Sequence, residues 1–497
     1  MNRLIPALSL LFVFSINVSS QVLTDAVRYS LLDVGGTARS VGIGGAIGAL
    51  GADFSVLSTN PAGAAAFRRS EFTFTPTLEL SSVDATLNGN DTTDTKTNFN
   101  FNNIGVVFSG SPLSSKWRTA VFGIGVNRMA NFHQNIYYEG TTYGSITDRW
   151  IELSEGVPPE QLDDFETGLA FDAGAIYDYD PDYSPSYVSD FLDANFSIGN
   201  FLVDKSQQIK RKGSINELVF TYAGNYDEKL MIGATLGVPI LNYEETKTYR
   251  ETDEENRLEN FDELEYTERL KTKGSGINFK LGLIYRLSQM IRLGAAIHTP
   301  TSFGLEDTFS TDLSYRYEDG NGIQRLEASS PEGTFEYRMR TPWRFIGSGG
   351  VIIQKQGFLS AELEYVDYTN AKLNFNSTSD PGDKAREEEV NGEINTQLKS
   401  ALNIRFGGEY ALESYRLRAG YSLMASPYAD IEETNGSLSL GAGYRGEGFF
   451  IDLAYKRLTS NSEYRPYLLS ESNIDIEQQI DIKDIRNRFM LTLGFKL

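Results

Sequence analysis

The stretch that decides the fold is "FMLTLGFKL", which runs from Phe489 to Leu497. Its residues change character with a period of two, as side chains do along a β-strand, where they point alternately to two faces. One face carries Phe489, Leu491, Leu493, Phe495 and Leu497, and the other carries Met490, Thr492, Gly494 and Lys496. A strand of this length with one continuous apolar face is typical of a tilted strand that crosses a bilayer.

The same period recurs along the rest of the chain. It marks fourteen segments, centred on 70–83, 98–109, 118–136, 214–226, 230–249, 264–287, 291–316, 333–353, 358–373, 394–412, 415–424, 437–445, 449–459 and 486–497. Tight turns alternate with long connections such as 84–97, 137–213 and 460–485. This asymmetry is typical of outer-membrane barrels, and a soluble β-sandwich has no reason for it. The pattern therefore predicts an all-β protein whose residues 70–497 form a fourteen-stranded antiparallel transmembrane β-barrel with periplasmic short turns.

The composition fits an exported protein. Residues 1–20 join Arg3 to an apolar run and end in small residues, which predicts a secretory signal peptide. The chain has no cysteine, and its net charge of -22 argues against binding to nucleic acid. We expect an integral barrel in a Gram-negative-type outer membrane, surrounded by outer-membrane lipid and inserted by the barrel-assembly machinery.

A second informative stretch, "ARSVGIGGAIGALGADFSVLSTNPAGAAAF", spans Ala38 to Phe67. Its glycines are spaced almost like a dinucleotide fingerprint, but no βαβ unit surrounds them, so nucleotide binding is rejected. Its apolar residues make it a poor solvated linker. Asn60 suits a helix N-cap and Pro61 the first helical position, and small residues allow close backbone packing. The stretch therefore predicts a compact plug inside a barrel.

This stretch resembles the N-terminal hatch of the FadL/TodX-type family, outer-membrane transporters of long-chain fatty acids and aromatic hydrocarbons. The shared features are the Gly-rich run, Ala52-Asp53 and Asn60-Pro61-Ala62, in the same order. The family barrel has fourteen strands. The resemblance implies a hatch over residues 21–69 that fills the lumen. The hatch and gating residues that it implies are Gly42, Gly44, Gly45, Asp53, Asn60, Pro61 and Ala62.

The segment "GIGVNRMANF", Gly123 to Phe132, is similar to the third strand of that family, in which a kink opens a side door in the wall. The resemblance implies a lateral opening at Gly123, Gly125 and Asn127. The alternative is that the two glycines only make room for the hatch.

Alternation places several basic side chains in the lumen. Arg405, Arg416 and Arg418 could bind the carboxylate of a cargo molecule. The alternative is that these arginines pair with inward acids, for which Glu362, Glu364, Glu409 and Asp452 are available.

The connection 137–213 is strongly acidic, with twelve Asp or Glu and no Lys or Arg between Ile151 and Asn195. Apolar residues at helical spacing near Leu162 and Phe191 predict two short helices in it. An imperfect calcium-loop pattern begins at Asp178, but a solvated acidic loop explains the same residues. The chain has two histidines and no arrangement of catalytic residues, so we expect no enzyme, no metal site and no cofactor.

These observations predict passive uptake of hydrophobic small molecules, with long-chain fatty acids as the first candidate, through a plugged barrel with a lateral exit. The alternative is a barrel of the same fold that serves protein secretion or surface attachment through its acidic loop. A channel for polar solutes is a third possibility, and the hatch argues against it.

Overall fold

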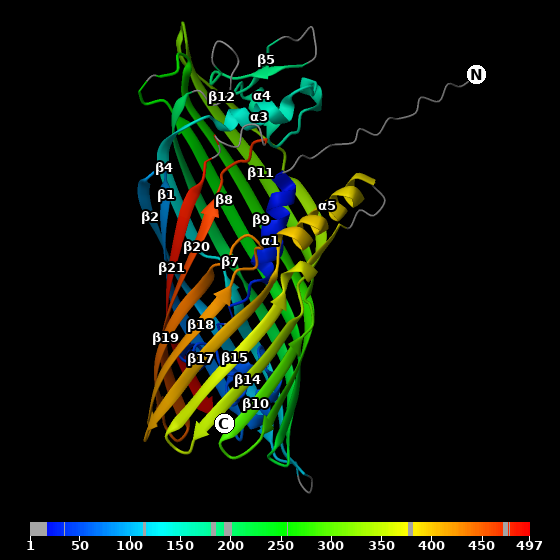
Figure 1. The fold of residues 1–497 in the computed structure, drawn as a ribbon, viewed down its shortest axis with the longest axis vertical. Coiled ribbons are helices and arrows are strands. Elements are labelled where there is room, and N and C mark those ends of the chain that lie inside the picture. The colour runs from blue at the N-terminus through cyan, green and yellow to red at the C-terminus, as the bar shows by residue number, and fades with distance from the viewer. Residues whose placement is uncertain are drawn as a thin grey trace, which may run out of the picture.

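The structure is a computed structural model. It describes residues 17–33, 35–112, 116–179, 185–192, 201–255, 257–375, 381–470, 476 and 478–497. Antiparallel strands form the wall of a closed barrel (Figure 1). In wall order they are β1 (Glu71–Leu87), β2 (Asn90–Gly110), β3 (Trp117–Asn131) continued by β4 (Gln134–Tyr143), β7 (Leu202–Tyr226), β8 (Leu230–Thr252), β9 (Phe261–Arg286), β10 (Ile291–His298) continued by β11 (Ser302–Asp319), β13 (Gly333–Arg340) continued by β14 (Arg344–Ile353), β15 (Gly357–Asp367) continued by β16 (Lys372–Phe375), β17 (Ser400–Leu412), β18 (Tyr415–Ala425), β19 (Thr434–Arg445), β20 (Phe449–Tyr464) and β21 (Ile480–Lys496).

The first and last wall strands close the barrel. Glu71 of β1 lies opposite Val107 of β2 on one side and opposite Lys496 of β21 on the other. When strands that continue one another are taken together, the wall has fourteen positions, which confirms the predicted fourteen-stranded antiparallel barrel. A further strand, β12 (Gly322–Ser329), forms a hairpin with the upper part of β11.

The outer surface of the barrel carries the apolar face of each strand. On β9, for example, Ile277, Phe279, Leu281, Leu283 and Tyr285 are exposed, whereas the residues between them face the lumen and are buried. Nearly every strand repeats this pattern over a similar length, and a continuous apolar outer band is the surface that a barrel presents to lipid. Among the described residues, no helix is long and apolar enough to cross a membrane.

The strands extend further than the sequence predicts, so several expected loops are shorter. The expected connection 84–97 is a hairpin that turns at Asn88 and Gly89. Within the expected loop 137–213, β4 extends to Tyr143 and β7 begins at Leu202. Only residues 144–201 therefore connect the two strands.

That connection folds into a cap at the upper end of the barrel (Figure 1). It contains α3 (Ile146–Ser154), η3 (Pro159–Gln161), α4 (Thr167–Asp172) and the pair β5 (Tyr177–Asp178) and β6 (Tyr187–Val188). One of the two expected helices corresponds to α4. The other is not formed by the described residues 185–192, where β6 occupies part of the segment. The cap residues Trp150 and Ile176 are buried against the upper parts of β8, β9 and β11.

The N-terminal segment enters the barrel. It comprises α1 (Asn17–Ser30), α2 (Ala38–Gly42), η1 (Phe54–Leu57) and η2 (Pro61–Ala66). Most of the predicted signal peptide lies outside the described residues, and its last four residues form the start of α1. In the upper lumen α1 packs against α5 (Pro381–Gln397), a helix of the β16–β17 connection, and the 3₁₀ turn η4 (Tyr368–Asn370) lies below α5.

Candidate functional site

The hatch is built from short capped turns, as its sequence predicts. Asn60 accepts a hydrogen bond from the backbone N–H of Ala62 at 3.2 Å, and Pro61 begins η2. The helix is of the 3₁₀ type. Asp53 caps η1 by accepting from the N–H of Ser55 at 2.9 Å, and it also accepts from the hydroxyl of Thr37. These caps satisfy donors that a short buried helix would otherwise leave unpaired.

Glycines bring the hatch and the wall into close contact. Gly44 has φ +67°, and a Cβ there would lie 2.9 Å from the backbone nitrogen of Tyr421. Gly42 lies against Gly441 of β19, and Gly45 lies against the side chain of Arg405. The sequence analysis missed the matching glycines in the wall. Hatch atoms touch the Cβ positions of Gly233, Gly282, Gly294, Gly407 and Gly420, and inward glycines in otherwise regular strands were the available signal.

The two glycines of the expected side door face the hatch. A Cβ on Gly123 would lie 2.6 Å from Leu57, and one on Gly125 would lie 2.6 Å from the ring of Phe54. Both glycines therefore leave room for η1, and the predicted lateral opening at these positions stays a prediction. Asn127 has a different environment: its amide donates to Ser58 of the hatch at 2.9 Å and accepts from Asn103 of β2 at 3.1 Å.

The wall is interrupted directly above Asn127. The ladder between β2 and β3 ends at the pair Asn103–Asn127, and β3 has an irregular register against β7 between Arg128 and Ala130. Above the break, side chains rather than backbone groups join β2 to β4. An example is the Thr92 hydroxyl, which donates to the carbonyl of Tyr137. Among the described residues, β2 from Thr95 to Asn102 forms no backbone ladder with β3 or β4.

The hatch lies directly behind this break. The N–H of Asp33 donates to the carbonyl of Met129, and the N–H of Gly35 donates to the carbonyl of Arg128, both at 2.9 Å. The carboxylate of Asp33 pairs with Lys456 at 2.6 Å and with Arg488 at 3.0 Å. Burial opposes the charge of Asp33, but these two cations outweigh it and hold the pKa of the carboxyl below its usual range.

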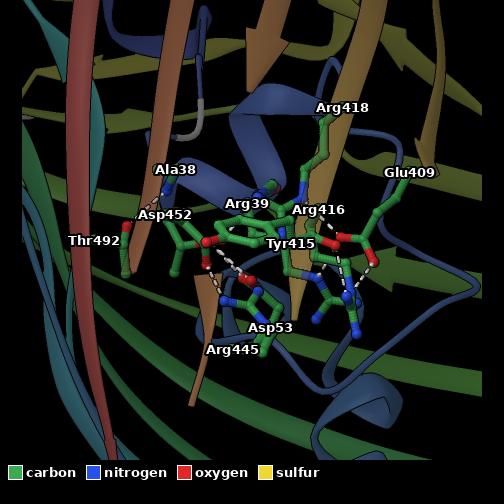
Figure 2. Close-up of polar contacts among 12 residues, drawn as sticks. Ala38, Arg39, Asp53, Glu409, Tyr415, Arg416, Arg418, Arg445, Asp452 and Thr492 are labelled. Carbon is green, nitrogen blue, oxygen red and sulfur yellow. Dashed lines mark hydrogen bonds and ion pairs between the residues drawn. The ribbon is translucent and has the colours of Figure 1, made fainter. Parts of the chain in front are cut away.

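The three arginines proposed to bind a carboxylate already have acidic partners. Arg405 pairs with Glu362 at 2.9 Å and with Glu364 at 2.5 Å. Arg418 pairs with Glu409 and with Asp452, both at 2.7 Å, close to Arg39 of the hatch (Figure 2). Arg416 lies 3.7 Å from Glu409 and donates to two turn carbonyls. The structure thus has the pairing that the alternative interpretation predicts.

A cation that the sequence analysis did not select, Arg128, differs from these three. Its Nε and one terminal nitrogen are buried and have no hydrogen-bond partner, and it has no ion pair within 4 Å among the described residues. The nearby carboxylate of Glu79 is already bound by Arg488 at 2.6 Å and by Asn131 at 2.8 Å. Arg128 lies at the break in the wall, which leaves its guanidinium available to an anionic group.

Two small cavities adjoin the break from inside. One, of about 50 Å³, lies between Leu32, Ser40, Met129 and Arg405, and the other, of about 30 Å³, lies between Tyr29, Met129 and Pro239. Sites for small organic ligands measure roughly 300–1,000 Å³. Neither cavity is large enough to hold such a ligand. Among the described residues, no group of three or more His, Cys, Asp or Glu side chains could hold a metal ion.

The upper lumen contains an apolar cluster. Leu23, Ala26 and Val27 of α1 are buried in a cluster with Phe303 and Met339 of the wall. The helix α5 covers this cluster with Val390 and Ile394. The cluster and the cavities follow one another from α1 to the break in the wall.

Comparison with solved structures identifies the fold. The chain resembles a Pseudomonas aeruginosa FadL homologue with a TM-score of 0.55 and 13% identity, covering 93% of this chain and 98% of that one. It resembles the P. putida toluene transporter TodX with a TM-score of 0.51 and 13% identity, covering 94% and 99%. No family model and no curated protein matches the sequence.

The closed barrel and its apolar outer band define the class of protein: it is an integral β-barrel of the outer membrane. Within that class, the barrel with its N-terminal hatch has the FadL-type fold, as the resemblance in the hatch sequence predicts.

Proposed function

We propose that the protein is a passive channel for hydrophobic small molecules, with long-chain fatty acids as the first candidate cargo, and that cargo leaves sideways between β2 and β3. The observation that carries this proposal is the break in the wall above Asn103–Asn127, with the hatch bonded to its edge at Met129 and Arg128.

The physical reason for a sideways exit is the hydrophobic effect. A cargo molecule that dropped into the aqueous periplasm would expose its apolar surface to water, whereas exit into the bilayer keeps that surface covered. The apolar cluster beneath α5 would receive the cargo, and a movement of residues 31–33 and 35–37 would join that cluster to the break. Among the similar structures, TodX is a toluene transporter, which agrees with an apolar cargo.

The unpartnered Arg128 favours a cargo with an anionic end. A fatty acid could place its carboxylate on this guanidinium while its tail enters the bilayer. A neutral hydrocarbon would gain nothing from the same group. This difference supports fatty acids over hydrocarbons within the proposed class of cargo.

A disulfide across the break tests the movement of the hatch. A Cβ on Gly35 would lie 2.7 Å from Cγ of Asn102, so cysteines at these two positions are within bonding reach. The chain has no other cysteine that could compete. We expect Gly35→Cys/Asn102→Cys to lose uptake of radiolabelled oleate when oxidised and to recover it when reduced. The measurement uses cells without their own fatty-acid transporter.

The two single-cysteine variants are the controls, and both should transport oleate like the parent protein. Normal uptake by the fully oxidised double variant would exclude a route that requires this part of the hatch to move. If the parent protein itself gives no uptake of oleate or toluene above cells that lack it, the proposed function is wrong.

A further inference from the structure

The outer face of the barrel carries three basic side chains close together on β13 and β16. Arg338 and Arg340 are two residues apart on β13, so they point to the same face. Lys372 of β16 lies directly opposite Arg340 in the ladder. All three side chains are exposed.

These cations lack the acidic partners that other outward cations of the barrel have. Lys212 pairs with Glu244 at 2.6 Å and Arg316 pairs with Asp262 at 2.5 Å, each across adjacent strands. Among the described residues, Arg338, Arg340 and Lys372 form no ion pair within 4 Å. Like charges directly opposite one another destabilise a sheet, so the pair Arg340–Lys372 has an energetic cost that a bound anion would remove.

The acidic residues closest to the three cations either interact with other groups or lie two residues further along the strands. Glu387 of α5 accepts from the amide of Asn374 and from the N–H of Phe375. Glu388 pairs with Lys384 at 3.9 Å. Glu336 and Glu306 lie opposite each other in the row above Arg338. None of these carboxylates neutralises the three cations.

The height of the three cations on the barrel indicates what they meet. Directly below Arg340, the outward side chains Trp343 and Phe345 begin the apolar band, and Tyr365 of β15 lies opposite Phe345. Aromatic residues mark the boundary between the hydrocarbon and the headgroups of a membrane. Because β13 continues upward toward the side of the long connections, the cations lie at the level of the outer-leaflet headgroups.

Space for a headgroup is available there. A groove of about 820 Å³ lies between these strands and α5, lined by Arg338, Arg340 and Lys372 on the strand side. Figure 1 shows α5 at the upper part of the barrel, where it contacts β16. On the adjacent strand, a Cβ at Gly304 would touch nothing within 4 Å.

We propose that this groove binds the phosphate group of an anionic lipid of the outer leaflet. The guanidinium groups of Arg338 and Arg340 can each form two hydrogen bonds to phosphate, and Lys372 adds a further positive charge. The lipid chains then lie along the apolar band below Trp343. The site is on the outer surface and is independent of the proposed transport through the lumen.

Purified protein in a neutral detergent tests the site with bis-phosphorylated lipid A as the probe. We expect the parent protein to retain lipid A in native mass spectrometry. Arg338→Gln/Arg340→Gln should weaken its affinity for lipid A at least tenfold. The matched control is Arg457→Gln/Lys483→Gln, which removes the same charge from the outer face of β20 and β21 and should bind like the parent protein.

A second variant does not depend on removing the arginines. Gly304→Glu adds a carboxylate opposite Arg338, where a side chain has room, and should also weaken binding. Dephosphorylated lipid A should bind the parent protein as weakly as lipid A binds the double variant, and inorganic phosphate at the same concentration should not displace lipid A. Equal affinity of the parent protein and the folded Arg338/Arg340 variant would overturn the proposal, as would an equal loss in the control or displacement by inorganic phosphate.

Discussion

At the scale of single residues, the arginines of the lumen differ from Arg128 at the break in the wall. Arg405 is bound by carboxylates of β15, and Arg418 is bound by carboxylates of β17 and β20, so these ion pairs join strands of the wall. Arg128 has no such partner, although it is partly buried. A buried cation without an anion is costly, which agrees with the proposed role of Arg128 in binding an anionic cargo.

We therefore expect Arg128→Gln to lower the uptake of oleate about tenfold, which corresponds to the loss of one charge-assisted hydrogen bond of about 1.4 kcal/mol. Uptake of toluene should not change, because toluene carries no charge. Parallel uptake assays in the same cells give both values. Arg416→Gln, which changes an arginine at the turn side of the lumen, is the control. An equal loss of oleate and toluene uptake would show that Arg128 only maintains the structure.

Asp25 of α1 gives the upper lumen a dependence on pH. Burial raises the pKa of its carboxyl from 3.8 to about 7, although Arg28 lowers it, and Asp307, Glu245 and Lys247 also face it. When α1 is undocked, the Asp25 carboxyl has its ordinary pKa. Docking of α1 therefore becomes less favourable as the pH rises from about 4 to about 7, and its free energy does not change further with pH above that range.

Protection factors of the α1 amides, corrected for intrinsic exchange, should be at least tenfold higher at pH 5 than at pH 8, since one pKa unit corresponds to about 1.4 kcal/mol. Asp25→Asn should remove this difference. The variant Asp307→Asn measures how much the neighbouring Asp307 carboxyl contributes to the difference in protection between pH 5 and pH 8. A pH effect that persists unchanged in Asp25→Asn would assign it to another group.

At the scale of elements, the position of the hatch depends on the wall, whereas the strand pairing of the wall does not depend on the hatch. The hatch folds with its own short-range hydrogen bonds, such as that from the N–H of Ala52 to the carbonyl of Gly63 at 3.0 Å. Its place in the lumen depends on wall residues such as Glu362, which accepts from the N–H of Gly48 at 3.0 Å. The wall strands are held by ladders that do not include the hatch, since β1 pairs with β2 and β21.

Deletion of residues 41–63 should therefore open the lumen and leave the barrel folded. The expected result is a large increase in ion conductance across planar bilayers and in the uptake of polar dyes by cells. Heat-dependent migration in gels checks that the barrel is intact. If the deleted protein is folded and its conductance is unchanged, the segment does not close the lumen.

At the scale of the whole molecule, the two ends of the barrel differ. Its short turns lie at one end, near the C-terminus, and the cap, α1 and α5 lie toward the other (Figure 1). An epitope inserted at Gly320, in the β11–β12 turn, should be reached by antibody on intact cells. One inserted at Glu447, between β19 and β20, should be reached only after permeabilisation. The opposite labelling would invert the assigned orientation.

The sequence by itself determined the elements and their faces. The alternation of apolar residues predicted fourteen wall positions and the outward face of each strand, because a period of two is a local property of extended chain. Asn60 and Pro61 likewise predicted a short capped helix in the hatch, because capping involves neighbours only two residues away.

Tertiary structure decided what each inward residue meets. Arg405 and Glu362 are 43 residues apart and meet because β15 and β17 adopt one particular register. Gly125 lies against Phe54 of the hatch, a contact between residues 71 positions apart. The break between β2 and β3 has no local signal in β2, since it arises only where the ladder with β3 ends and the hatch bonds to the exposed carbonyls. Long-range pairing of this kind depends on the whole closed barrel, and no short stretch of sequence specifies it.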